Sequence, residues 1–335
     1  MLGSKLEPTV ISYNAGISAC VKGQQWQRAL SLLSEMLVLK SQPDVISFSA
    51  GISACEKGHQ WQRALLLLSE MLGSILEPDV ISYNGVISAC EKGKQWQRAL
   101  SLLSEMSGSM LEPDVISYSA GISACGKCQQ WQRALSLLNE MLVSKLEPTV
   151  ISYNAGISAC EKCQQWQLAL SLLSDMVETR LEPTMISYNA GISACEKGQQ
   201  WQRALSLLSE MLGSKLEPTV ISYNAGISAC EKGQQWQRAL SLLSEMLGSE
   251  LEPTVISFSA GISACVKGQQ WQRALSLLSE MSASKLDPNI ISYSAGISAC
   301  STGGQWQRAL SLLNEVLGSK LEAGATGLVA ARRGV

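Results

Sequence analysis

The feature that most constrains this chain is a strict sequence period of 35 residues. All nine tryptophans fall on this period, from Trp26 to Trp306, and the nine prolines keep the same interval from Pro8 to Pro288. Self-similarity at such an interval is the signature of a solenoid, a propeller or a similar array. The chain is therefore one short unit repeated, and its function must be one that a small unit can perform nine times.

Each unit predicts two helices joined by a short turn. In the first unit Val10, Tyr13, Ile17 and Cys20 form one apolar stripe of a helix, and Asp, Thr or Asn before each later copy of this segment is a good N-cap. A second helix is expected from about residue 25 through 36. In most later units it ends at Leu-Gly-Ser, where glycine can serve as the C-terminal stop, and proline then separates the units.

Neither helix can hide its apolar face alone, so stacking of neighbouring units must supply the core. We predict an all-α fold, a right-handed α-solenoid superhelix of about nine helix-turn-helix repeats. Residues 1–9 are interpreted as the tail of a truncated preceding repeat, and 325–335 as a short irregular tail. The nine repeats are expected at 10–44, 45–79, 80–114, 115–149, 150–184, 185–219, 220–254, 255–289 and 290–324.

Charge and cysteine usage narrow the class of protein. The formal net charge is −2 and the sequence pI about 5.7, so the strongly basic balance typical of nucleic-acid-binding domains is missing. Nine of the eleven cysteines occupy one repeat position, which favours buried packing in a reducing interior over a disulfide framework. No apolar run reaches the length of a membrane span, and no targeting peptide is visible.

One face of the predicted first helix combines an apolar residue, a polar residue and a lysine, as in Ile11, Asn14, Ser18 and Lys22. The isoleucines either pack between neighbouring helices or form apolar ledges that hold base faces, and the lysines are either solvated helix ends or phosphate contacts. The isoleucines are Ile11, Ile46, Ile81, Ile116, Ile151, Ile186, Ile221, Ile256 and Ile291. The lysines are Lys22, Lys57, Lys92, Lys127, Lys162, Lys197, Lys232 and Lys267, with Thr302 in the ninth unit.

The unit Val-Ile-Ser-Tyr-Asn-Ala-Gly-Ile-Ser-Ala-Cys-Glu-Lys-Gly, followed by Ala-Leu-Ser-Leu-Leu-Ser-Glu-Met and Leu-Glu-Pro-Thr, resembles the pentatricopeptide repeat. The resemblance extends from Val10 to about Glu322, and the uniform unit length is similar to the pure 35-residue subclass. It implies that each unit reads one base of single-stranded RNA with two or three side chains. The isoleucines would sandwich the bases and the lysines would contact phosphate.

The resemblance places the base readers at the fifth and last residues of each unit. These pairs are Asn14 with Asp44, Ser49 with Asp79, Asn84 with Asp114, Ser119 with Thr149, Asn154 with Thr184, Asn189 with Thr219, Asn224 with Thr254 and Ser259 with Asn289. The ninth unit pairs Ser294 with Gly324 and has Ala323 for proline, so we expect it to be degenerate. By the family's code the pairs imply a strand U-G-U-purine, three pyrimidines, then A. The last-position residues are equally explained as helix caps.

Other chemistry finds little support in the sequence. Cys125 and Cys128, like Cys160 and Cys163, form a C-x-x-C motif, but neighbouring helices pack too far apart to bring four thiolates to one zinc ion, so no metal is predicted. His59 replaces a turn glutamine and is the only histidine. No cofactor and no enzymatic activity are expected, because no nucleophile with a paired base appears and the zinc deaminase signature is absent.

Two functions from different classes remain open. Sequence-preferring binding of single-stranded RNA, in organellar RNA processing, stabilisation or translation, agrees with the isoleucine, amide and lysine face. A protein-protein interaction scaffold of the tetratricopeptide kind agrees better with the near-neutral charge. Protein partners recruited to the RNA and a location in chloroplast or mitochondrion follow from the resemblance alone, and no membrane association is expected.

Overall fold

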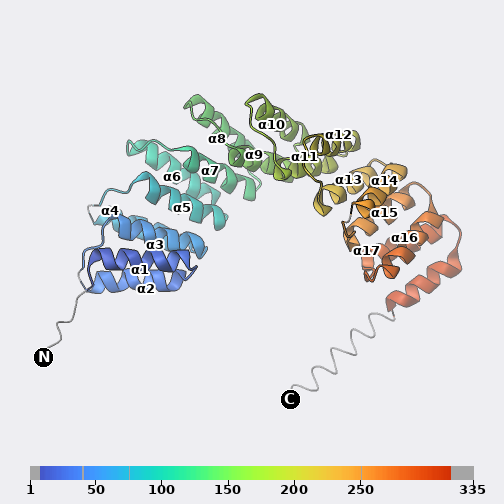
Figure 1. Ribbon diagram of the computed structural model, residues 1–335, viewed down its shortest axis with the longest axis horizontal. Helices are drawn as coiled ribbons and strands as arrows, with labels where there is room; N and C mark the ends of the chain where they lie inside the picture. The colour runs from blue at the N-terminus through green and yellow to red at the C-terminus, as the bar shows by residue number, and fades with distance from the viewer. Residues whose placement is uncertain (1–7, 40, 75, 250, 318–335) are drawn as a thin grey trace, which may run out of the picture. The chain divides into compact units, whose positions relative to one another are not determined.

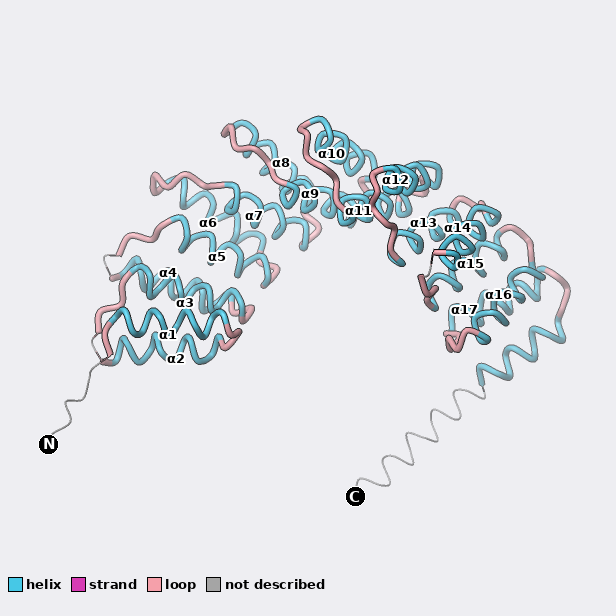
Figure 2. The backbone as a smooth tube through the Cα atoms, in the orientation of Figure 1, coloured by secondary structure: helices cyan, strands magenta, loops and turns pink. Residues whose placement is uncertain are grey.

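The structure is a computed structural model that describes residues 8–39, 41–74, 76–249 and 251–317, and every regular element in these ranges is a helix (Figures 1 and 2). The helices of the first four repeats are α1 (Val10–Lys22), α2 (Trp26–Val38), α3 (Val45–Lys57), α4 (Trp61–Gly73), α5 (Val80–Lys92), α6 (Trp96–Gly108), α7 (Val115–Lys127) and α8 (Trp131–Val143). They are followed by α9 (Val150–Lys162), α10 (Trp166–Glu178), α11 (Met185–Lys197), α12 (Trp201–Gly213), α13 (Val220–Lys232), α14 (Trp236–Gly248), α15 (Val255–Lys267), α16 (Trp271–Ala283) and α17 (Ile290–Thr302). Residues 306–317 are helical as well.

The predicted helix pairs are thus confirmed in every repeat. The segments assigned to 1–9 and 325–335, and the end of the ninth repeat, lie mostly or wholly outside the described residues. The chain divides into two compact units, one of residues 1–163 and 174–182 and the other of residues 164–173 and 183–335. Inside each unit the first helices stack on one another. The first helices of the same and the next repeat are both in contact with each of the second helices α2, α4, α6, α8, α12, α14 and α16.

Each first helix begins at a polar cap. Asp44, for example, has an extended backbone, and its carboxylate accepts a hydrogen bond from the backbone N–H of Ser47, while the Ser47 hydroxyl accepts one from the backbone N–H of Asp44. Thr149 and Thr184 make the same reciprocal capping box. The predicted N-caps are therefore confirmed, with serine completing the box three residues into the helix.

The turn between the two helices of a repeat does not use its glycine for the left-handed backbone conformation. The left-handed backbone is taken by the next residue, such as Gln24 with φ of 57°, while Gly23 keeps φ of −80°. Where a later copy of this position is glycine, the tryptophan of the preceding repeat packs against it: a Cβ on Gly58 would lie 2.6 Å from the ring of Trp26. Two copies, Cys128 and Cys163, do carry a side chain. The recurring tryptophan and glycine, 32 residues apart, therefore mark a packing contact between neighbouring repeats.

The prediction that glycine stops the second helix is also wrong, because a later residue takes the left-handed conformation. Gly213 is the last residue of α12, and the left-handed conformation belongs to Lys215, with φ of 59°. The N–H of Leu216 then bonds back to the carbonyl of Met211 at 3.1 Å, which closes the helix end as in a Schellman motif. A lysine side chain can occupy this conformation because the surrounding hydrogen bonds fix it.

The same positions of successive repeats form the buried core. Tyrosine or phenylalanine, isoleucine, alanine and cysteine of the first helices meet alanine, leucine and methionine of the second helices, as in Phe48, Ile52 and Met71. The eight repeat cysteines from Cys55 to Cys300 are fully buried and Cys20 is half-buried. None of the eleven cysteines is in a disulfide, and burial raises the pKa of Cys90 to about 11. Their predicted packing role is confirmed.

Candidate nucleic-acid interface

The nine repeat isoleucines lie on the surface. Their side chains are between 59% and 80% exposed, from Ile291 to Ile11, although they belong to helices whose other apolar residues are buried. Packing between neighbouring repeats is therefore excluded as their role. Within each of the two compact units, successive repeats present a row of solvent-exposed apolar side chains, one from the first turn of each first helix, and such a row leaves an apolar face available to a ligand.

The residues at the fifth and last positions of a repeat lie together. The Nδ2 of Asn14 donates to Oδ1 of Asp44 at 3.1 Å, and the Nδ2 of Asn84 donates to Oδ1 of Asp114 at 3.0 Å. The amide of Asn224 reaches the hydroxyl of Thr254 at 3.5 Å. The cap of one first helix thus meets a side chain of the previous first helix, 30 residues earlier.

A serine that the sequence did not single out completes this cluster. Ser117, the third residue of its repeat, is fully buried; its hydroxyl donates to Oδ1 of Asn84 at 2.5 Å and also lies 2.9 Å from Oδ1 of Asp114. Ser47 joins Asn14 and Asp44 in the same way. The signal for it was present, since serine occupies the third position of all nine units.

These contacts use the two aspartate oxygens unequally. All the hydrogen bonds that Asp44 and Asp114 accept from described residues reach Oδ1, so Oδ2 has no donor in this part of the chain. Burial raises the pKa of both carboxyls, but hydrogen bonds from Ser47 and Asn14, or from Ser117 and Asn84, outweigh it and hold each pKa below the ordinary 3.8. Each cap is therefore a carboxylate near neutral pH with one oxygen open to a further donor.

Repeats with serine at the fifth position are built differently. The hydroxyl of Ser49 lies 2.8 Å from that of Ser82, which in turn donates to Oδ1 of Asp79 at 2.7 Å. Ser119 with Ser152 and Ser259 with Ser292 repeat the serine pair at the same distance. The reader and the cap of these repeats are therefore joined through the next repeat's serine, and the short side chain leaves more room above it than asparagine does.

Threonine caps use their single oxygen within the protein. Oγ1 of Thr149 lies 3.2 Å from the hydroxyl of Ser152 and accepts from the backbone N–H of Ser152 at 3.4 Å. Thr219 and Thr254 are arranged in the same way beside their serines. In the ninth repeat Ser294 is exposed, while Gly324 and Ala323 lie outside the described residues.

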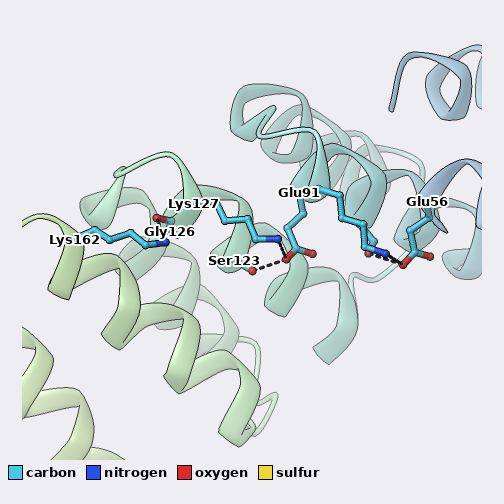
Figure 3. A network of polar contacts seen from close by, with 8 residues as sticks. Glu56, Glu91, Ser123, Gly126, Lys127 and Lys162 are labelled. Atoms are coloured by element: carbon cyan, nitrogen blue, oxygen red, sulfur yellow. Dashed lines mark hydrogen bonds and ion pairs between the residues drawn. The ribbon is translucent and has the colours of Figure 1, made fainter. Parts of the chain in front are cut away.

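The lysine row at the other end of the first helices carries ion pairs between repeats. Lys127 reaches Glu91 at 2.9 Å, and the hydroxyl of Ser123 donates to the same carboxylate at 2.6 Å (Figure 3). Lys92 with Glu56, Lys232 with Glu196 and Lys267 with Glu231 form the same contact. These glutamates and lysines thus form a ladder of ion pairs between successive repeats.

Three lysines lie where the ladder is interrupted. Residue 126 is glycine where other repeats have glutamate, so the ammonium of Lys162 lies 3.4 Å from the backbone carbonyl oxygen of Gly126 (Figure 3). Val21 stands where Lys57 would find its glutamate, and Lys22 belongs to the first repeat of this sequence. These three lysines are exposed and make no ion pair with a described residue.

The extra cysteines occupy the turn position that is glycine elsewhere. The thiol of Cys128 lies 3.2 Å from the carbonyl of Lys94, and that of Cys163 lies 3.2 Å from the carbonyl of Gln129, one repeat earlier in each case. No group of three or more His, Cys, Asp and Glu side chains in the described ranges could hold a metal ion. His59 lies exposed in a turn, with φ of 55°. Over the same ranges, no helix has the length and apolarity needed to cross a membrane.

Sequence profiles of pentatricopeptide repeats match nearly the whole chain. The PPR repeat family matches residues 78–127, 113–160 and 148–197; the pentatricopeptide repeat domain matches 31–93, 206–268 and 241–303; and the PPR repeat matches 11–40, 186–216 and 291–321. Together these matches run from residue 11 to 321. The chain belongs to the pentatricopeptide repeat family.

Solved structures agree on the fold. The pentatricopeptide repeat protein PPR10 from maize has a TM-score of 0.80 at 20% identity, over 94% of this chain and 44% of the maize chain. The same protein in complex with an 18-nt psaJ RNA element has a TM-score of 0.75 at 19% identity, over 92% of this chain and 45% of the other. The chain thus spans less than half the length of the maize protein. No curated protein matches it in sequence. The α-solenoid prediction is confirmed.

Proposed function

We propose that the chain binds single-stranded RNA, with one base per repeat. The observation that carries the proposal is the regular alternation of an exposed isoleucine with a polar cluster at each helix cap. In the repeats that end in aspartate, one carboxylate oxygen of this cluster has no donor among the described residues. A base laid between two isoleucines would present its polar edge to the reader and the cap. The solved complex of the similar maize protein with RNA supports the same use of this fold.

The free carboxylate oxygen gives a physical reason for base preference. Uracil carries an N–H donor between two carbonyls, whereas cytosine has an acceptor there, so an Asn amide with an aspartate Oδ2 favours uracil. Guanine has an N–H and an amino group on its edge where adenine has an acceptor, so Ser49 with Asp79 favours guanine. A threonine whose hydroxyl is engaged in capping discriminates less. The proposed strand is U-G-U-purine, three pyrimidines, then A.

Phosphate contact is proposed to be uneven along the lysine row. A lysine paired with glutamate must give up an ion pair to bind phosphate, whereas Lys22, Lys57 and Lys162 have no carboxylate partner among the described residues. We therefore assign the strongest phosphate contacts to these three. A role in organellar RNA processing, stabilisation or translation, the recruitment of protein partners to the RNA and the lack of catalytic activity belong to the same proposal.

The test is to bind the purified chain to a randomised single-stranded RNA pool and to sequence what is retained. An enriched U-G-U-purine core is the expected result. The matched control is Asp114→Thr, which should relax selection at the third nucleotide alone. Retention without sequence bias would refute base reading. No retention even at low salt would refute RNA binding and favour a protein-binding scaffold, whose complexes depend much less on salt.

A further inference from the structure

Two asparagine readers of the second compact unit, Asn189 and Asn224, each meet a buried serine of the next repeat. The hydroxyl of Ser222 donates to Oδ1 of Asn189 at 2.6 Å, and that of Ser257 donates to Oδ1 of Asn224 at 2.6 Å. Both serines are fully buried, whereas both asparagines are half-buried. Each serine is therefore placed to decide how an amide near the surface is turned.

The other contacts of these serines direct their protons to the asparagines. A serine hydroxyl has one proton and two lone pairs. The oxygen of Ser222 accepts the backbone N–H of Thr219 at 3.0 Å and lies 3.2 Å from Oγ1 of Thr219. Ser257 has the same contacts with Thr254, at 2.9 and 3.2 Å. Because the contact to the asparagine oxygen is the shortest, the serine proton lies there, and the threonine hydroxyl donates to the serine oxygen.

The kind of cap decides how much the serine matters. Oδ1 of Asp114 can only accept, so Asn84 must turn its Nδ2 toward it, at 3.0 Å, whatever the serine does. A threonine hydroxyl can donate or accept, so Thr254 imposes no orientation on Asn224, whose Nδ2 lies 3.5 Å from Oγ1 of Thr254. In these repeats with threonine caps, the serine is the group that keeps the amide oxygen turned to the protein and leaves an N–H for a ligand.

We infer that the serine at the third position of a repeat is a positioning residue for base choice in the repeat before it. Ser222 and Ser257 hold Asn189 and Asn224 with an N–H available to the base, and they thereby favour uracil over cytosine at nucleotides 6 and 7. Uracil has a carbonyl acceptor at position 4 where cytosine has an amino donor, so a reader restricted to N–H pairs only with uracil there, whereas a reader that can turn accepts either. The inference rests on the proposed function and sharpens two positions that the reader and the cap alone define only as pyrimidine.

The experiment measures, by fluorescence anisotropy, the affinity of the full chain for two RNAs of the proposed strand that carry uracil or cytosine at nucleotide 6. The wild type should favour uracil by about fivefold, the effect of one hydrogen bond. Ser222→Ala should bring this ratio to about one, because the amide can then turn. Ser222→Thr keeps the hydroxyl and should keep the wild-type ratio. Ser257→Ala should act in the same way at nucleotide 7 and leave the ratio at nucleotide 6 unchanged.

Ser152 provides the matched control for stability. It is as deeply buried as Ser222 and contacts its threonine cap, Thr149, in the same way, but it pairs with the serine reader Ser119 and has no amide to orient. Ser152→Ala should therefore lower the urea midpoint as Ser222→Ala does, and the ratio at nucleotide 6 should stay at the wild-type value. Circular dichroism confirms that each variant is folded.

The repeat with an aspartate cap separates positioning from a general loosening of the site. Ser117→Ala should keep the preference for uracil at nucleotide 3, since Asp114 still orients Asn84. An equal loss of preference in Ser117→Ala and Ser222→Ala, each at its own nucleotide, overturns the inference. So does a wild type that selects pyrimidine at nucleotide 6 without favouring uracil, or a Ser222→Ala variant that keeps the wild-type ratio, and both leave base reading intact. A wild type that binds no RNA, or binds it without any base preference, refutes the proposed function itself.

Discussion

The first helices carry a polar network at each end, and the two networks use their charges differently. At the amino-terminal end, Asn84, Asp114 and Ser117 form a largely buried cluster in which one carboxylate oxygen has no donor among the described residues. At the carboxyl-terminal end, Lys127 and Glu91 satisfy each other on a half-exposed surface. Both networks join neighbouring repeats. The first leaves a carboxylate oxygen that a ligand could contact, whereas in the second the lysine ammonium is already paired with a glutamate.

The largest expected effect is on the buried network. Ser117→Ala removes the donor to Oδ1 of Asn84 and one contact to Asp114, and a buried acceptor left unsatisfied costs about 1–3 kcal/mol of unfolding free energy. Ser12→Ala is the matched control, because the exposed Ser12 contacts only Thr9, and a loss under about 0.5 kcal/mol is expected. Urea unfolding measures both, and equal losses would contradict the coupling role.

The next effect separates ligand recognition from capping. Asp114→Thr keeps a helix cap but removes the free Oδ2, so the preference for uracil over cytosine at the third nucleotide should fall about tenfold, or roughly 1.4 kcal/mol. Thr219→Asp should raise uracil preference at its own nucleotide. Fluorescence anisotropy with RNAs that differ at one base measures both changes. Unchanged profiles would leave these residues as caps alone.

Acid should weaken the amino-terminal network. The folded pKa values of Asp44 and Asp114 lie below the ordinary 3.8, so the unfolded chain binds protons more readily. The stability that these carboxylates contribute is present above pH 3.8 and is lost as pH falls through the folded pKa values. Urea midpoints at neutral and acidic pH measure the loss. The variant with both Asp44→Asn and Asp114→Asn should show a smaller drop; an equal drop would place the acid sensitivity elsewhere.

The smallest effect compares two lysines of one row. Lys162→Ala should weaken all RNAs alike by about threefold and lower the slope of log affinity against log salt by about 0.7, the value for one phosphate on a single strand. Lys127→Ala should change the slope less, because Glu91 already holds that ammonium, and should cost at most about 1 kcal/mol of stability. Equal slopes for the two variants would contradict the proposed unevenness, and a loss confined to one RNA sequence would contradict a phosphate role.

Much of the fold could be predicted from the period. The helix pairs, the N-caps and the buried cysteines follow from local rules of apolar spacing and capping, which act within one unit. The roles of the glycines could not be predicted in this way. Gly58 packs against Trp26 of the preceding unit, and the left-handed backbone conformation belongs to residues near the glycines in sequence. Chain spacing alone does not show which residues of two units touch.

The same limit applies to the candidate site. The exposed isoleucine row and the fifth and last positions were found from the sequence with the family resemblance, but Ser117 was not, because its partners are 3 and 33 residues away. The pairing of Lys92 with Glu56, 36 residues earlier, was likewise hidden behind the adjacent Glu91 in the sequence. Contacts between repeats recur at about one period, and comparing units in register would have revealed both.

The packing of tryptophan on the next repeat's glycine also has a consequence for how the chain folds. Since Trp26 fits Gly58 as Trp201 fits Gly233, a second helix can dock on a first helix that is not its neighbour and leave whole repeats looped out. Such misregistered species would be compact and slow to rearrange, a known failure of repeat proteins. The repeats that depart from the common pattern, with Cys128, Cys163 and Gly126, are then the marks by which the correct register is distinguished from its near copies.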